Sequence, residues 1–340
     1  MTIAQKLPVN QFDHFYKGGN RIGALRHGPG GPMRPEEWIG SVTTRFGATD
    51  QGLSRLSNGQ LLRDAILASP TDWLGSAHYE AFGSSTELLC KLLDPDQDLP
   101  VHYHPNKSFS RAHLGLSHGK TEAWIILEAP EGATVGLGFK RTMALDEVSE
   151  LVKRRNAPAL INSLNHYAVS AGDTVLVPAG VVHSIGKDIF VLELQEPTDL
   201  SILLEWEKFA VDGEKDGHLG LGFELALQAL NLDVLSDDFL SKLVVRGALS
   251  SESQNSVFSE VADPFFRADY LPSSGSTADA GFAVVIVLDG AGTIKFSNQP
   301  NIDVVKGDAI VIPHCAGGWD GHGFVGLLCR PPLPIEAKAQ

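Results

Sequence analysis

Residues 172–183, which read GDTVLVPAGVVH, constrain the fold of this chain more than any other segment. The initial glycine and aspartate are typical of a tight turn, because glycine adopts positive φ angles without strain. The next four residues are mostly β-branched and predict a short buried strand. Pro178 and Gly180 then end the hydrogen-bonded ladder and turn the chain. His183 falls on the following strand, where a neutral imidazole facing the interior of a barrel can bind a metal.

Two earlier histidines and a glutamate are the expected partners of His183. His102 and His104 are two residues apart, so on a strand both imidazoles face the same side of the sheet. Alone, such a pair fits exposed or hydrogen-bonded histidines as well as it fits a metal site. Glu122 opens the apolar run 123–127, and a carboxylate at the mouth of a buried strand needs a partner. A metal ion would supply that partner, and the alternative is an edge glutamate that faces water.

The order of these motifs resembles one known family. The stretches LCKLLDPDQDLPVHYHPNK, HGKTEAWIILEA, GFK and SAGDTVLVPAGVVHSIGKDIFVLELQEPTD follow one another as in type I mannose-6-phosphate isomerases. The likeness covers about residues 35–200, includes an early PEEWIGS, and weakens after Asp199. It implies a bicupin enzyme with one zinc ion. By position, the implied metal ligands are His102, His104, Glu122 and His183.

Two positions depart from the pattern of that family. His102 replaces the glutamine that is the family's first ligand. Three histidines and one carboxylate also hold manganese, iron or nickel in other cupins, and imidazole suits all of these metals, so the sequence leaves the metal open. Leu203 occupies the position of the family's active-site arginine. The resemblance implies that this arginine handles the substrate, so its replacement bears on phosphate recognition and on proton transfer.

The expected fold is mainly β: a bicupin of two jelly-roll-like β-barrels, with a small helical insertion near residues 145–165 and a helical connector. The expected divisions are an N-terminal metal-binding cupin domain at 1–215, the connector at 216–250, and a degenerate C-terminal cupin domain at 251–340. In more detail, we expect short strands and turns over 38–145, a helix over 146–155 and a helical segment over 222–245.

The last part of the chain repeats the turn, strand and proline of the first motif. GDAIVIP at residues 307–313 has the spacing of GDTVLVP at 172–178, which indicates an internal repeat. Before it, VVIVLDGAGTIKF predicts a hairpin that turns around Asp289 and Gly290. Gly318 stands where the repeat would require a histidine, and the neighbouring histidines are out of register. We therefore expect the C-terminal barrel to carry no metal.

Composition narrows the choice of partners and compartment. The net charge of −14 argues against nucleic acid and against an anionic membrane surface. No apolar run reaches the roughly 20 residues of a membrane span, and the N-terminus lacks the pattern of a signal peptide. Three cysteines without metal or redox spacing fit a reducing compartment, and Cys90 is expected in the core. We expect a cytoplasmic protein and leave its oligomeric state open.

The remaining site candidates follow from the chemistry of the implied reaction. Aldose–ketose isomerisation moves a proton between neighbouring carbons, which requires a base and stabilisation of negative charge on the sugar oxygens. The resemblance implies that Lys140 and Glu193 face the metal as catalytic residues. The alternative for Lys140 is a solvated surface side chain, whereas Glu193 would be costly to bury without a role. Lys107 and Lys120 flank the ligand motifs and are candidates to bind the substrate's phosphate, although lysines beside loops are usually solvated.

The leading hypothesis is a metal-dependent aldose–ketose isomerase, with one divalent ion, expected to be zinc. Its expected substrates are mannose 6-phosphate and fructose 6-phosphate, or a related sugar. One alternative is a dioxygenase-like cupin metalloenzyme, and another is a cupin that binds sugar without turning it over. Anaerobic isomerisation with zinc would support the first hypothesis, oxygen consumption with a redox-active metal the second, and metal-independent sugar binding the third.

Overall fold

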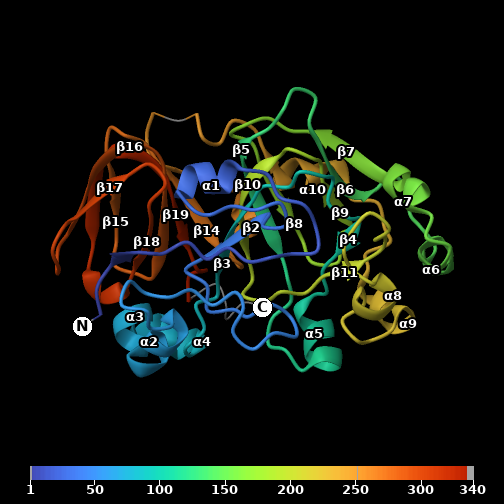
Figure 1. The fold of residues 1–340 in the computed structure, drawn as a ribbon, viewed down its shortest axis with the longest axis horizontal. Helices are drawn as coiled ribbons and strands as arrows, with labels where there is room; N and C mark the ends of the chain where they lie inside the picture. Colours follow the sequence, from blue (N-terminus) through green and yellow to red (C-terminus); the bar gives the residue numbers. More distant parts are fainter. Residues whose placement is uncertain (1, 251, 335–340) are drawn as a thin grey trace.

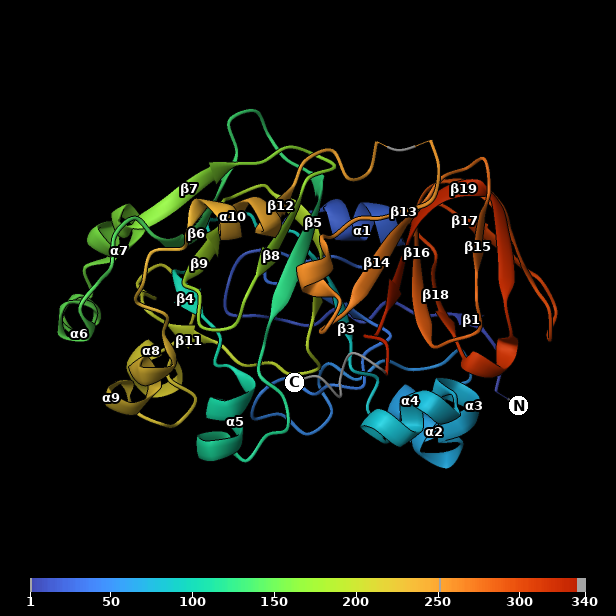
Figure 2. The same ribbon diagram turned by 180° about the vertical axis from the view of Figure 1, so that it is seen from behind.

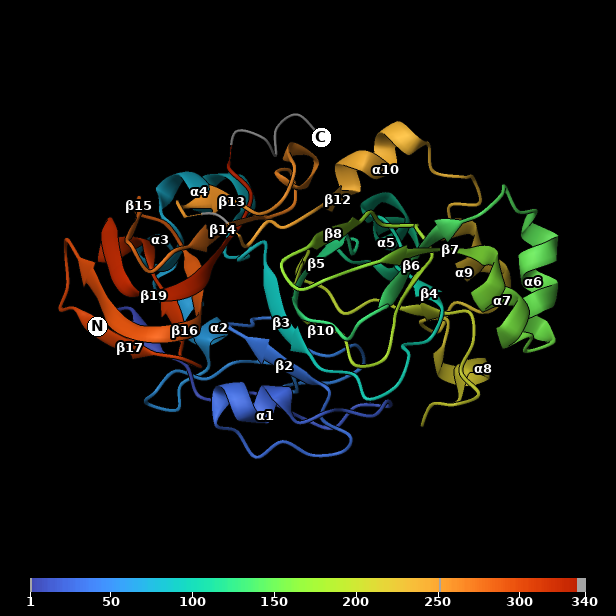
Figure 3. The ribbon, with the colours of Figure 1, turned by 90° about the horizontal axis from the view of Figure 1, so that it is seen from above.

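Antiparallel β-sheets dominate the fold (Figures 1 and 2). The computed structural model describes residues 2–250 and 252–334. Over these residues, sheets of six and five strands form the N-terminal part, and a sheet of eight strands forms the C-terminal part. Seen from above, the C-terminal sheet lies beside the two N-terminal sheets (Figure 3). The expectation of a mainly β protein is confirmed, and the finer description as two jelly-roll-like barrels stays a prediction.

The two N-terminal sheets contain all of the predicted ligand strands. The six-stranded sheet has the order β12 (Val244–Val245), β8 (Thr174–Val177), β5 (Glu122–Glu128), β10 (Phe190–Gln195), β3 (Leu89–Leu93) and β2 (Glu36–Ile39). The five-stranded sheet has the order β11 (Ile202–Leu203), β4 (His102–Tyr103), β9 (His183–Ile185), β6 (Thr134–Phe139) and β7 (Leu164–Ala168). The short buried strand predicted after Gly172 is β8, and His102 and His183 lie on strands as expected.

The C-terminal sheet takes one strand from the start of the chain. Its order is β1 (Gln5–Lys6), β18 (Ala309–Ile312), β16 (Ala283–Phe296), β19 (Trp319–Arg330), β14 (Arg267–Leu271) and β13 (Asn255–Ser256), with β15 (Ser276–Ala278) on β19 and β17 (Ile302–Val305) on β16. Because β1 pairs with β18, and β12 of the connector pairs with β8, sheet membership crosses the predicted domain boundaries at two points. The division at residues 215 and 250 stays a prediction.

The internal repeat is present in the backbone. Gly172 and Gly307 precede β8 and β18 with φ angles of 91° and 88°. In both turns the aspartate after the glycine accepts a hydrogen bond from a backbone N–H three residues earlier: Asp173 from Ser170 at 3.0 Å and Asp308 from Val305 at 2.8 Å. The same local sequence therefore builds the same turn twice.

The hairpin predicted around Asp289 and Gly290 is wrong. β16 continues through both residues as one strand of 14 residues, with register shifts against β19 on either side of them. A Cβ atom at Gly292 would lie 1.8 Å from the carbonyl oxygen of His322. Glycine is thus needed here because two long strands approach closely at a bulge, and the chain does not reverse.

Helices are more numerous in the first half than the sequence suggested. They are α1 (Arg21–Arg26), α2 (Leu62–Ala68), α3 (Pro70–Leu74), α4 (Ser76–Phe82), α5 (Lys107–Leu114), α6 (Leu145–Lys153) and α7 (Ala157–Ser163). The expectation of mainly strands and turns over 38–145 missed α2 to α5. Figure 1 shows α2 to α4 grouped below the C-terminal sheet, and their signals were the proline that begins α3 and the spacing of the buried side chains of α2. The helix predicted at 146–155 is confirmed as α6.

The connector is not one continuous helix. Helix α8 (Gly213–Asp216) ends where the connector begins. The connector contains α9 (Phe223–Ala226), η1 (Leu227–Ala229) and α10 (Asp237–Leu243), and the C-terminal part adds η2 (Glu260–Ala262) and η3 (His314–Ala316). The predicted helix at 222–245 breaks because Asn231 accepts a hydrogen bond from the Asp233 N–H, and Ser236 caps a new helix start. None of the described helices is both long and apolar enough to cross a lipid bilayer.

One apolar core joins the two parts of the molecule. The buried cluster that fills the N-terminal sheets includes Cys90 on β3 and continues to Val284 on β16 and Cys329 on β19. Cys90 is therefore a core residue, as expected. A second cluster lies between the five-stranded sheet and the connector, and a third fills the C-terminal sheet. This shared packing holds the candidate ligand strands on a rigid support.

Candidate metal centre and its cavity

The three predicted histidines lie together in the N-terminal part. β4 and β9 pair so that His102 stands directly opposite His183. The ring centroids of the three histidines are 4.1 to 5.0 Å apart, and His104 and His183 are almost completely buried. One ligand nitrogen from each ring lies within 4.8 Å of the others. The Gly180 N–H donates to the carbonyl oxygen of His104 at 2.7 Å, so the two motifs are directly hydrogen-bonded.

Glu122 reaches the histidines from the neighbouring sheet. It is the first residue of β5 and is buried. The Lys120 N–H donates to the Pro105 carbonyl at 3.0 Å, which ties the glutamate's segment to the histidine pair. Gly119 allows this approach, since a Cβ atom there would lie 2.6 Å from the backbone of Asn106. The four candidate ligands, which are separated in the sequence, therefore form one cluster in the structure.

The hydrogen bonds of the histidines fix which ring nitrogen is free. Each Nδ1 faces a backbone carbonyl oxygen: His102 that of Pro100 at 2.7 Å, His104 that of Leu200 at 2.5 Å, and His183 that of Val181 at 2.8 Å. A carbonyl only accepts, so in each neutral ring Nδ1 carries the proton and Nε2 keeps its lone pair. Orientation of a ring by a backbone carbonyl is typical of metal-binding histidines.

The free acceptor atoms converge on one point. Glu122 Oε2 lies 2.9 Å from His104 Nε2, and Glu122 Oε1 lies 3.3 Å from His183 Nε2. Burial lowers the pKa of His104 to about 3, so this ring is neutral and does not donate to the carboxylate. His104 Nε2 and His183 Nε2 are buried and have no hydrogen-bond partner among the described residues, whereas the Glu122 carboxylate accepts from Trp124 Nε1 at 3.0 Å and lies 2.9 Å from Lys120 Nζ. Buried imidazole nitrogens are costly when unpaired, and a divalent cation between the two rings and the carboxylate would bind them all.

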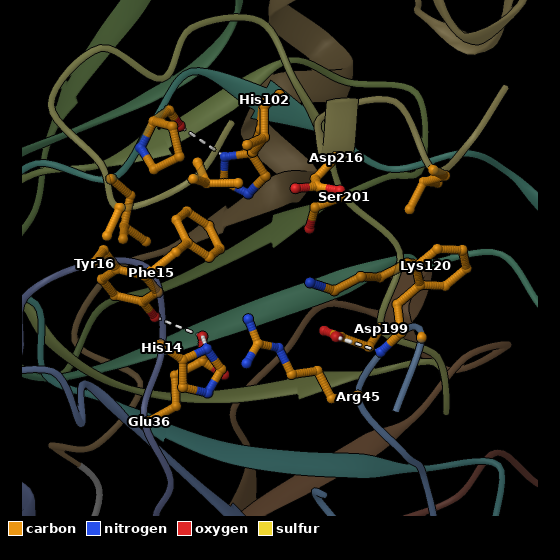
Figure 4. A pocket seen from close by; sticks show the side chains of 18 of the residues that line it. His14, Phe15, Tyr16, Glu36, Arg45, His102, Lys120, Asp199, Ser201 and Asp216 are labelled. Carbon is orange, nitrogen blue, oxygen red and sulfur yellow. Dashed lines mark hydrogen bonds and ion pairs between the residues drawn. The ribbon is translucent and has the colours of Figure 1, made fainter. Parts of the chain in front are cut away.

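A cavity of about 750 Å³ opens beside this cluster (Figure 4). His102 and Glu122 line it from the cluster, Lys120 from the segment before β5, Glu193 from β10 and Leu203 from β11. Further lining residues come from several other segments: His14, Tyr16, Glu36, Arg45, Lys91, Asp199, Asp212, Lys215 and Asp216. This size is in the range of small-molecule sites, and the lining is unusually rich in charge.

The chain as a whole is similar to known isomerases, although no protein-family model matches it. It is 29% identical over 319 residues to the mannose-6-phosphate isomerase of Streptococcus mutans, covering 92% of this chain and 93% of that protein. It is 28% identical over 284 residues to mannose-6-phosphate isomerase ManA of Bacillus subtilis, covering 82% and 85%. The crystal structure of the Bacillus subtilis mannose 6-phosphate isomerase superposes with a TM-score of 0.74 at 20% identity, over 96% of this chain and 99% of that chain.

The chain is thus similar to mannose-6-phosphate isomerases over most of its length, in sequence and in fold. The resemblance seen in its motifs is therefore confirmed, and it extends beyond residue 200, where the motifs weaken. The structure places both residues that depart from the family pattern, His102 and Leu203, at the cavity. His102 stands among the candidate ligands, and Leu203 pairs with it across β4 and β11 and is buried in the cavity wall. Leu203 therefore gives the cavity wall a hydrophobic surface next to the candidate metal site.

Lys120 and Glu193 both line the cavity. Lys120 Nζ is 2.9 Å from Glu122 Oε2 and 4.0 Å from Glu193 Oε1. Burial, together with repulsion from Glu122, raises the pKa of Glu193 to about 7. Because this value is close to neutral, the carboxyl group can both accept and release a proton there. The roles of both residues stay proposals.

Lys140 and Lys107 lie away from the cavity. Lys140 follows β6, is exposed, and its ammonium group donates to the carbonyl oxygen of Asn162 at 2.8 Å. The side chain before it, Phe139, is buried, and alternation along a strand turns the lysine outward. Lys107 begins α5 and does not line the cavity. The catalytic role expected for Lys140 and the phosphate role expected for Lys107 do not fit these positions.

The sequence reasoning missed Lys91 and the carboxylates around it. Lys91 Nζ lies 3.6 Å from Glu36 Oε2, 3.7 Å from Glu193 Oε1 and 3.6 Å from Asp199 Oδ1. Burial alone would lower the pKa of this lysine, but the carboxylates outweigh it and the pKa is raised. A single lysine within the apolar stretch of β3 was a usable signal, because a buried ammonium group requires partners.

A second missed group surrounds Glu36. Tyr16 donates its hydroxyl hydrogen to Glu36 Oε1 at 2.6 Å, and Trp38 Nε1 donates to Glu36 Oε2 at 2.7 Å. His14 Nδ1 lies 3.5 Å from the same carboxylate. Figure 4 shows His14 and Tyr16 on one side of the cavity, with Glu36 beneath them. Glu36 belongs to the PEEWIGS motif, whereas His14 and Tyr16 carry no local signal of their position.

Proposed function

We propose that this protein is a metal-dependent aldose–ketose isomerase that interconverts mannose 6-phosphate and fructose 6-phosphate. The substrates are those named for its relatives in Streptococcus mutans and Bacillus subtilis. The observation that carries the proposal is the convergence of lone pairs from His104, His183 and Glu122 on one point at the wall of a charged cavity. That arrangement supports a cation at the site rather than a set of hydrogen-bonded core residues.

His102, His104, Glu122 and His183 would hold one divalent ion, which we propose to be zinc. When bound, the ion would stabilise the negative charge that develops on the sugar oxygens. Zinc is supported by the imidazole-rich ligand set and by the reaction, which transfers no electrons to or from the metal. Lys120, at 2.9 Å from Glu122 Oε2, adds a fixed positive charge beside the same oxygens.

Glu193 is the proposed acid–base residue. Isomerisation needs one group that removes a proton from one sugar carbon and returns it to the neighbouring carbon. Glu193 lines the cavity, its Oε1 atom has no hydrogen-bond partner among the described residues, and its pKa near 7 suits both transfers. Lys91 Nζ lies 3.7 Å from that oxygen and orients the carboxyl group.

We also propose a cytoplasmic location. Sugar phosphates are charged metabolites, and none of the three cysteines, Cys90, Cys315 and Cys329, is in a disulfide. Free thiols are typical of proteins in a reducing compartment.

Metal removal tests the proposed function. The chelated protein is expected to lose the conversion of mannose 6-phosphate to fructose 6-phosphate under anaerobic conditions, and to regain it with one equivalent of zinc. Full isomerisation by demonstrably metal-free protein would contradict the proposal. Oxygen consumption by an iron-loaded protein without any isomerisation would favour the dioxygenase-like alternative instead.

A further inference from the structure

The cations of the cavity differ in how far carboxylates neutralise them. Lys91 lies within 4 Å of three carboxylates, and Lys120 lies close to Glu122 and Glu193. Both ammonium groups are buried and already paired. Lys215 is exposed on α8, between the cavity-lining carboxylates of Asp212 and Asp216. Lys91 and Lys120 therefore offer no unshared positive charge to an anion inside the cavity, and Lys215 is a solvent-exposed side chain.

Arg45 is different. Its guanidinium group lines the cavity and forms no ion pair within 4.0 Å of any described carboxylate. Its Nη1 atom donates to the carbonyl oxygen of Asp13 at 3.3 Å and to Oε1 of Gln51 at 3.2 Å, both neutral acceptors. No described group accepts from Nε or Nη2. A guanidinium group has five N–H donors, so the face that matches an oxyanion is available.

The loop that carries Arg45 is fixed by hydrogen bonds. The Arg45 N–H donates to the Gln51 carbonyl at 2.8 Å, and the Arg45 carbonyl accepts from the Ala48 N–H at 2.9 Å. The Phe46 N–H donates to Asp199 Oδ2 at 3.0 Å, which anchors the loop to the segment that follows β10. The arginine is thus preorganised, and little of its binding energy is lost in ordering the loop.

The position of Arg45 suits the shape of the proposed substrate. Figure 4 shows its side chain extending into the cavity at the opposite end from His102, with Lys120 between them. In a hexose 6-phosphate the reacting carbons, C1 and C2, and the phosphate on C6 are likewise at opposite ends of the chain. With the reacting carbons beside the ligand cluster, the phosphate lies toward Arg45. Leu203, next to His102, offers no charge to it.

We propose that Arg45 binds the phosphate group of the substrate and so determines selectivity for phosphorylated over free sugars. The proposal rests on the proposed isomerase function. It places anion recognition on a loop near residue 45, away from the strand where Leu203 replaces the family's arginine. An arginine clamps a phosphate through two parallel, charge-assisted hydrogen bonds that a leucine or an amide cannot reproduce.

The test compares metal-loaded wild type with Arg45→Gln and Arg45→Lys. In Arg45→Gln the KM for fructose 6-phosphate should rise by about 10- to 100-fold, and by much more than the KM for fructose, while kcat changes less. The KM of Arg45→Lys for fructose 6-phosphate should fall between those of wild type and Arg45→Gln, because lysine keeps the positive charge and loses the paired donors. Arg63→Gln on α2 is the matched control, since it removes an arginine that does not line the cavity.

Binding of inorganic phosphate, followed by calorimetry without turnover, separates this proposal from the isomerase function. We expect wild type to bind phosphate, Arg45→Gln to bind it at least about tenfold more weakly, and Arg45→Lys to bind it with intermediate affinity. Equal phosphate affinity in wild type, Arg45→Gln and Arg45→Lys would overturn the role of Arg45, whether or not the protein isomerises any sugar. Loss of activity on fructose and fructose 6-phosphate by the same factor would overturn it as well.

Discussion

The two repeated turns of this molecule lead to very different surroundings. After the proline that follows β8, the chain turns at Gly180 and delivers His183 into the ligand cluster. After the proline that follows β18, the chain forms η3, turns at Gly317, and enters β19 with Gly318 at the position that corresponds to His183. The turn, the strand and the proline are the same in both places. The reactive half and the inert half therefore differ in the side chains that follow them.

The buried polar residues make the contrast clear. In the N-terminal sheets, buried ionisable groups include His104, Glu122, Lys91 and Glu193. In the described residues from 255 onward, Ser276 is the one polar residue with a buried side chain, and the rest of the core is apolar. Burying ionisable groups costs free energy, so a half that keeps several of them retains them for chemistry. The C-terminal half does not carry this cost, and its apolar core supports the N-terminal sheets.

The largest expected effect separates the two halves by their histidines. His183→Ala should remove the bound metal and lower isomerase activity on the order of 1,000-fold, because the ion supplies several kcal/mol of transition-state stabilisation. His322→Ala in β19 should leave metal content and activity unchanged. Metal analysis and kinetics on both variants check this. A His183→Ala protein with full metal content would contradict the assignment of the metal to the N-terminal half.

Glu193→Gln should lower kcat by about 100-fold or more while metal content stays the same. The amide has the shape of the carboxyl group but cannot exchange the proton. Glu128→Gln, on the exposed end of β5, is the matched control, and its kcat should equal that of wild type. A Glu193→Gln enzyme with unaltered kcat would remove this residue from proton transfer and leave the metal assignment intact.

Lys91→Met should destabilise the fold by about 3 kcal/mol or more, because the carboxylates of Glu36, Glu193 and Asp199 would lose their shared counter-charge in a buried site. The variant also loses the contact of the ammonium group with the Trp38 ring at 4.4 Å. Denaturant unfolding measures the change. A loss below about 1 kcal/mol would mean that water reaches these groups and that the network is not buried.

Ile310→Val is the smallest expected effect. Ile310 is fully buried in the apolar core of the C-terminal sheet, so the removal of one methylene should cost about 1 kcal/mol of unfolding free energy. The isomerase kinetics should not change. If kcat falls with stability intact, the C-terminal half takes part in the reaction, and the division between the halves is less sharp than proposed.

The sequence predicted the parts of the site that are encoded by fixed spacings. His102, His104, Glu122 and His183 lie in short motifs whose turns and strands are locally determined, and Glu193 stands out as a charge in an apolar strand. Lys140 was misplaced because the motif gave its neighbourhood in sequence but not the face of the strand on which it lies.

Other features depend on contacts that no local pattern encodes. Arg45 reaches the cavity from a loop whose partners, Gln51 and Asp199, are set by the tertiary fold. The hairpin predicted in β16 failed because a glycine pair suits both a turn and a bulge, and only the long partner strand β19 decides between them.

The location of bound zinc distinguishes the N-terminal sheets from the C-terminal sheet. Crystals of the zinc-loaded protein, examined by anomalous scattering at the zinc edge, should show one strong peak per chain among His102, His104, Glu122 and His183. The C-terminal half should show none. A strong peak inside the C-terminal sheet, or zinc bound elsewhere with these four side chains unliganded, would contradict the account.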